Sequence, residues 1–157
     1  MRAMWILVLM MGLAAASAAA EPAATDIVVH SAKGEFADVK DRVLMAIENR
    51  GMVLSSTAHV GDMLERTGKD LGRKRRIYSH ADVLEFCNAV LSRDTMEADP
   101  HNIVFCPYTI AVYALPNEPG KVYLSYRKPA AGGSAASIKA LAAVEKLLEA
   151  IVREARN

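Results

Sequence analysis

The chain has 157 residues, with 19 lysine and arginine side chains against 18 aspartates and glutamates. A formal net charge of +1 shows no basic or acidic excess, which disfavours a specialist in binding nucleic acid or membrane surfaces. This length suffices for one domain with a modest core and is short for two.

The first residues are typical of a secretory signal peptide, which we expect to span residues 1–20. Arg2 supplies a positive start, an apolar run covers Met4–Ala16, and the small residues Ser17–Ala20 precede Glu21. The apolar run is shorter than the ~20 residues of a membrane-spanning helix, so we expect no stable membrane insertion after cleavage. The sequence therefore predicts an exported protein, periplasmic or secreted.

The first half of the mature chain alternates strand-like and helical patterns. Apolar side chains at three- and four-residue spacings predict a helix over residues 36–50, with Gly51 as its C-terminal stop. β-Branched residues predict a strand over residues 26–30. A second strand is expected over residues 52–59, followed by a short helix over residues 62–67.

The central stretch of the chain carries both cysteines, one on each side of a short helical segment. A strand is predicted over residues 77–87, and Asn88 is a good N-cap for a helix that ends at Asp99-Pro100. Further strands are predicted over residues 103–115 and 121–126, joined by a turn. Alternation predicts which side chains of these two strands face the core. They are Val104, Cys106, Tyr108, Ile110 and Val112 in the first strand, and Val122, Leu124 and Tyr126 in the second.

The C-terminal part is predicted to be a linker followed by a helix. Alanine, glycine and serine at residues 129–136 indicate a flexible linker, and residues 137–157 form an amphipathic helix. Its apolar stripe must be buried against its own sheet or a second subunit; the stripe comprises Ile138, Leu141, Val144, Leu148, Ile151 and Ala155.

The domain organisation follows from these elements. A flexible tail over residues 21–25 precedes one domain over residues 26–128, to which the C-terminal helix is added. The order β-α-β-(α)-β-α-β-β, with that helix, predicts an α+β two-layer sandwich.

Familiar catalytic motifs are absent from the sequence. It contains no G-x-S-x-G, no glycine-rich phosphate loop, no C-x-x-C and no H-E-x-x-H. We therefore assign no catalytic residue from the sequence and favour a non-catalytic protein.

Cys87 and Cys106 allow three interpretations. In an oxidising compartment they can form a disulfide that closes a loop of about 20 residues. They can also be inert buried side chains. As free thiols they can converge with His59 on a soft metal such as Cu(I) or on Zn, with Met63 and Met96 as further sulfur donors. Cys87 precedes a predicted helix N-terminus, where the helix dipole favours the thiolate.

The central stretch resembles the domain of unknown function 302 family over residues 26–128. The helix ending in arginine-glycine, followed by a strand and His59, is similar to the first half of that family. The segments that carry the resemblance in the second half are Glu85–Asn88, Ala98–Pro100, Cys106-Pro107, Ile110–Tyr113 and Gly120–Tyr126. The resemblance implies a compact α+β fold in bacteria or archaea, often paired as a homodimer, and it brings no activity with it.

Three functional hypotheses follow. The first is a non-catalytic module that binds a small ligand or a soft metal. The second is a thiol redox or sulfur-handling protein that uses Cys87 and Cys106. The third is a structural or interaction protein with a disulfide-stabilised core, for which the basic run Arg73–Arg76 and the C-terminal helix are candidate surfaces.

Overall fold

The computed structural model describes residues 26–129 and 133–157. The predicted signal peptide at residues 1–20 and the tail at 21–25 lie outside the described residues, as do residues 130–132 of the predicted linker. None of the described helices is long and apolar enough to cross a membrane.

Strands and helices follow one another in the predicted order, with one additional 3-10 helix (η1). The elements are β1 (Ile27–Lys33), α1 (Phe36–Glu48), β2 (Leu54–Ala58), α2 (Val60–Asp70), β3 (His80–Phe86), α3 (Ala89–Ala98), η1 (Pro100–Phe105), β4 (Tyr108–Ala114), β5 (Lys121–Arg127) and α4 (Ala135–Ala155).

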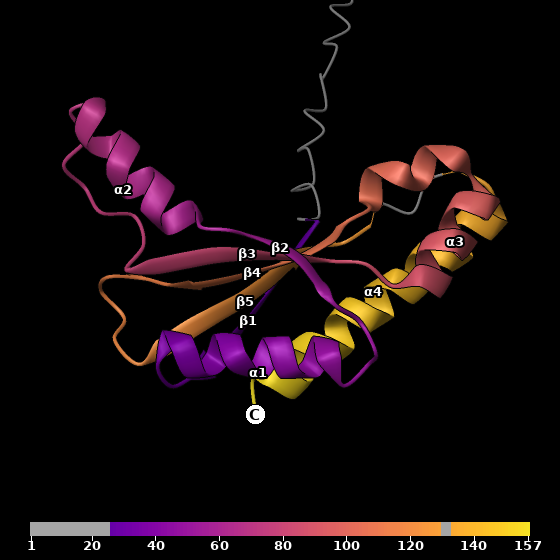
Figure 1. Cartoon of the computed structure of the whole chain (residues 1–157), viewed down its shortest axis with the longest axis horizontal. Coiled ribbons are helices and arrows are strands. Elements are labelled where there is room, and N and C mark those ends of the chain that lie inside the picture. The colour runs from indigo at the N-terminus through magenta and orange to yellow at the C-terminus, as the bar shows by residue number, and fades with distance from the viewer. Residues whose placement is uncertain (1–25, 130–132) are drawn as a thin grey trace, which may run out of the picture.

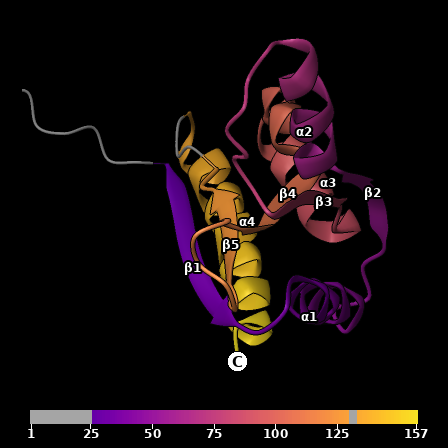
Figure 2. The same cartoon turned by 90° about the vertical axis from the view of Figure 1, so that its left-hand side faces the viewer.

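The five strands form one antiparallel sheet in the order β1-β5-β4-β3-β2. Helices α1 and α4 pack on one face of this sheet, and α3 packs against α4 (Figure 1). Strands β1 and β2 lie at opposite edges (Figure 2). Helix α2 stands on the other side of the sheet and contacts β3. The predicted α+β sandwich is confirmed.

The core lies between the sheet and helices α1 and α4. Alternation along β4 and β5 directs every second side chain towards the helices, as the sequence predicts. The fully buried side chains include Ile110, Val112, Val122 and Leu124 from these strands, Val39, Val43 and Ile47 from α1, and Val144 and Ile151 from α4.

The stripe of the C-terminal helix is buried within its own domain. Leu148 is only 3% exposed, because it packs into the core that α4 shares with the sheet. Ile138 is wrongly included in the predicted stripe, since it is 41% exposed. In the first turn Ser137 is buried instead, and its hydroxyl accepts a hydrogen bond from Asn102 Nδ2 at 2.9 Å.

The predicted strand over residues 103–115 begins too early. Residues 100–105 form η1, whose first turn is capped by Asp99 Oδ1, which accepts the His101 N–H at 2.9 Å. Val104 is 78% exposed rather than in the core. Because Pro107 has no backbone N–H to donate, regular pairing starts only at Tyr108.

Gly61 allows α2 to begin close to the sheet. A Cβ atom at this position would lie 2.8 Å from the backbone nitrogen of Ala81, which is closer than real Cβ contacts allow. The glycine thus lets the first turn of α2 lie directly on β3.

Candidate functional site

The two thiols meet where β3 and β4 leave the sheet. Cys87 follows the last residue of β3, and Cys106 follows η1 and precedes Pro107. Phe86 of β3 is paired with Tyr108 of β4, so the two cysteines come from neighbouring positions beyond the end of this ladder. Their Sγ atoms are 3.0 Å apart, and both thiols are free and half-buried.

Helix α3 covers the thiol pair. The Asn88 side chain caps this helix by accepting the Leu91 N–H at 2.9 Å, which confirms the predicted N-cap. From the first turn, Ser92 Oγ lies 3.8 Å from Cys106 Sγ and donates to the Tyr108 hydroxyl at 3.3 Å. The helix therefore brings one hydroxyl next to the thiols.

A buried amide fixes η1, the segment that leads to Cys106. Asn102 Nδ2 donates to the Thr95 carbonyl oxygen of α3 and to Ser137 Oγ of α4, both at 2.9 Å. Because Asn102 is only 7% exposed, these hydrogen bonds hold η1 against two helices at a site shielded from water. The position of Cys106 therefore depends on tertiary contacts rather than on a regular strand.

The environment of Cys87 favours the thiol over the thiolate. Burial and the neighbouring Cys106 raise the pKa of Cys87 to about 11, and the backbone hydrogen bond to Tyr108 opposes this only in part. The thiolate expected at the N-terminus of α3 is therefore not favoured, because burial and the neighbouring Cys106 both oppose the ionisation of Cys87.

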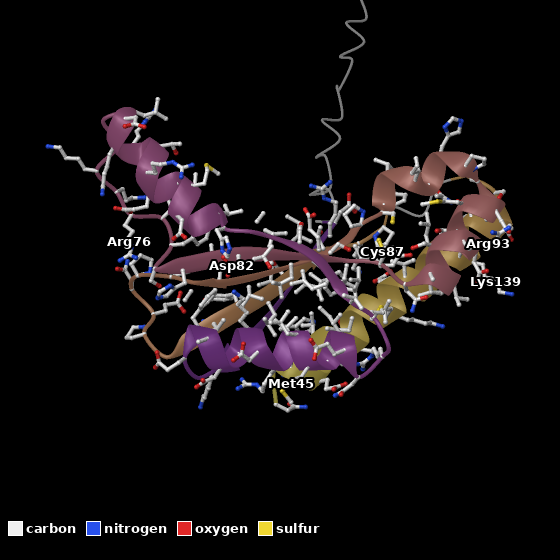
Figure 3. All side chains as sticks on the ribbon, in the orientation of Figure 1. Met45, Arg76, Asp82, Cys87, Arg93 and Lys139 are labelled. Carbon is white, nitrogen blue, oxygen red and sulfur yellow. The ribbon has the colours of Figure 1, made fainter. Side chains whose placement is uncertain are left out.

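His59 lies apart from the thiols. Its Nδ1 is 2.8 Å from Asp82 Oδ1, and Lys40 Nζ of α1 lies 2.7 Å from Asp82 Oδ2. Asp82 precedes Cys87 by five residues of extended chain, or about 16 Å. Figure 3 shows Cys87 near α3 and Asp82 farther along β3, towards α2.

The Asp82 cluster joins three elements of the fold. Burial tends to raise the pKa of Asp82, but the hydrogen bonds from Lys40 and His59 lower it overall. The ionised carboxylate, only 7% exposed, thereby holds α1 and the start of α2 to β3. The sequence analysis missed Asp82 and Lys40, which lie far apart in the chain.

The proposed soft-metal donors are therefore only partly brought together. Within residues 26–129 and 133–157, no group of three or more histidine, cysteine, aspartate or glutamate side chains is placed to hold a metal ion. Met63 is exposed on α2 and Met96 lies on α3. What converges is a pair of sulfur atoms.

Comparison with known proteins indicates the family. The model of the domain of unknown function DUF302 matches residues 27–155, which includes α4. A crystal structure of an uncharacterized conserved protein DUF302 from Bacillus stearothermophilus superposes with a TM-score of 0.70 at 19% identity, covering 85% of this chain and 100% of that chain. No curated protein matches this chain.

Proposed function

The chain belongs to the DUF302 family, a domain of unknown function, and on that premise we propose that Cys87 and Cys106 form a reversible dithiol–disulfide pair in an exported protein. The observation that carries this proposal is the separation of 3.0 Å between their Sγ atoms. A disulfide has an S–S bond of about 2.05 Å, so oxidation requires an approach of only about 1 Å.

Oxidation would proceed by thiol–disulfide exchange with a low-molecular-weight disulfide. A thiolate of the pair attacks one sulfur of that disulfide, forms a mixed disulfide and releases the other half as a thiolate. The second cysteine then attacks the sulfur of the first and releases the remaining half. Two protein thiols are oxidised, one small disulfide is reduced, and the two protein protons pass to the two leaving thiolates.

The pair is better suited to forming a disulfide slowly and keeping it than to catalysing rapid thiol–disulfide exchange. With its pKa raised to about 11, Cys87 keeps its proton at neutral pH, and the thiolate is the attacking species. No motif of a rapid thiol oxidoreductase accompanies it, since C-x-x-C is absent from the sequence. We therefore assign the pair to a non-catalytic module that its disulfide stabilises or regulates.

A soft metal between the same two sulfur atoms is the second candidate function. The observation that favours it is that two thiols converge while His59 lies with Asp82. Two thiolates suit Cu(I), which accepts soft donors in low coordination numbers, whereas a structural Zn site takes four ligands. Cu(I) is therefore the metal that this pair would bind, and His59 would not take part.

Counting thiols in the exported protein tests the first proposal. The protein is recovered from its native compartment, unfolded and alkylated with a maleimide, with and without prior reduction, and its mass is measured. We expect no maleimide addition before reduction and two additions after it. In a second sample, the protein is incubated with oxidised glutathione and alkylated without reduction. Two maleimide additions to that sample would contradict the proposal.

Metal binding is tested separately on the reduced protein. Anaerobic titration with Cu(I) against a competing chelator is expected to give one bound ion per chain, which Cys87→Ser or Cys106→Ser removes. His59→Gln is the matched control and should bind as the wild type does. Equal binding by the serine variants would exclude the thiol pair as the metal site.

A further inference from the structure

Strands β4 and β5 separate at one end and leave a gap in the sheet. Their ladder runs from Ala114–Val122 only as far as Ala111–Ser125. Strand β4 begins three residues earlier, at Tyr108, and β5 continues two residues further, to Arg127. In continuous register Thr109 would face Arg127, but that pair is not formed.

The gap opens into a cavity of about 490 Å³. Side chains from the open face of the sheet line it at Thr109, Ala111 and Ser125, and α4 contributes Val144 and Leu148 from the other side. The cavity therefore reaches from the face of the sheet opposite α1 and α4 towards the helical layer. Its volume lies within the range of small-molecule sites in proteins.

The backbone at the gap presents hydrogen-bonding groups to the cavity. The Lys128 N–H donates to Asp26 at 2.7 Å, so the polar groups of Lys128 point towards β1, and those of Arg127 point towards β4. Ala111 pairs with Ser125, so its backbone N–H and C=O groups point towards β5. Thr109 lies two residues earlier in β4, and by the same alternation its backbone groups also point towards β5. Thr109 and Arg127 thus aim peptide groups into the gap between them.

The charge at the cavity is positive. Arg127 and Lys128 line it, and none of the described lining residues is an aspartate or glutamate. Lys128 is paired with Glu145 at 3.4 Å, whereas none of the ion pairs within the described residues includes Arg127. The exposed guanidinium can therefore form a bidentate pair with a carboxylate.

We propose that this cavity binds a small organic carboxylate, with an aromatic or aliphatic body between β4, β5 and α4 and its carboxylate at Arg127. The body would contact the apolar walls, which include Phe105, Pro107 and Val144. The Thr109 and Arg127 peptide groups would supply the directional hydrogen bonds. Neither cysteine lines this cavity, although Cys106 lies in the sequence between the lining residues Phe105 and Pro107.

Naphthoate is the probe for the test, because it combines an aromatic body with one carboxylate. Titration of the full mature protein, followed by calorimetry and by amide NMR shifts, is expected to give saturable binding of one molecule per chain. The largest shifts should fall at Thr109, Ala111, Ser125 and Arg127. A lack of saturation, or shifts centred elsewhere, would overturn the proposal.

Two substitutions, each with a matched control, locate the site. Ala111→Phe fills the cavity and should abolish binding, whereas Ala58→Phe, at an exposed position of β2 outside the cavity, should leave it unchanged. Arg127→Gln should weaken naphthoate binding about tenfold, as the loss of one charged hydrogen-bonding partner does. Arg66→Gln, on the exposed surface of α2, should bind as the wild type does.

A neutral analogue and a thiol-free variant make the result specific. Naphthylmethanol should bind the wild type about tenfold more weakly than naphthoate and should be insensitive to Arg127→Gln. Equal affinity of the two probes would refute the role of Arg127. The Cys87→Ser/Cys106→Ser protein should still bind naphthoate, so failure of the thiol proposal and failure of this one are distinguishable.

Discussion

Oxidation of the thiol pair should raise the free energy of unfolding by about 3 kcal/mol. The bond would close a loop of about 20 residues, from Cys87 through α3 and η1 to Cys106, and loop entropy gives that magnitude. The native state needs little rearrangement, because the Sγ atoms already lie 3.0 Å apart. For a domain of this size, about 3 kcal/mol corresponds to a melting temperature higher by about 10 °C.

Urea and thermal unfolding of the oxidised and the reduced protein measure this difference. The urea transitions should separate when reductant is added to one sample only. The Cys87→Ser/Cys106→Ser protein is the control, and its transitions should not respond to reductant. Coincident transitions of the oxidised and reduced wild-type protein would refute the argument that the pair constrains the unfolded chain.

Three further predictions concern the contacts that hold the fold. Leu148→Ala should cost about 3 kcal/mol of stability, measured by urea unfolding, whereas Leu71→Ala, at a position 72% exposed, should change it by less than about 0.5 kcal/mol. Asp82→Ala should cost about 2 kcal/mol, because it leaves the Lys40 ammonium and the His59 ring without their hydrogen-bond acceptor, and the exposed Asp70→Ala should be nearly neutral. Burial tends to raise the pKa of Glu149, but hydrogen bonds from arginine, tyrosine and histidine side chains lower it from 4.5 to about 2. The ionised Glu149 therefore contributes to the free energy of unfolding above pH 4.5, and this contribution is lost as the pH falls towards 2. Unfolding measured across that range should show a weaker pH dependence in Glu149→Gln, and an unchanged profile would contradict the assignment.

Local patterns in the sequence predict much of the architecture. Asn88 is followed by a helix whose third N–H it accepts, as its position before an apolar run indicates. The alternation in β4 and β5 assigns Ile110, Val112, Val122 and Leu124 to the core, where the structure places them. Each of these predictions depends on residues close together in the chain, for which period and capping chemistry are sufficient.

The prediction fails where distant segments compete with local propensity. Val104 continues an apolar strand-like run, yet it lies exposed in η1, because Asp99 caps one end of this segment and Asn102 bonds to α3 and α4. Likewise His59 is a reasonable metal ligand by residue type, but its imidazole lies against Asp82. Neither outcome is visible in a local pattern, because both depend on partners remote in sequence.

By itself, the sequence determined the order of helices and strands, the burial of the C-terminal helix stripe and the presence of two cysteines beside one helical segment. Only the tertiary structure decided that the two sulfur atoms meet, that His59 lies elsewhere, and that β4 and β5 part to leave a cavity. The physical reason is that periodicity specifies which face of an element is buried. The separation of atoms from different elements depends on strand register and helix packing, which are properties of the whole domain.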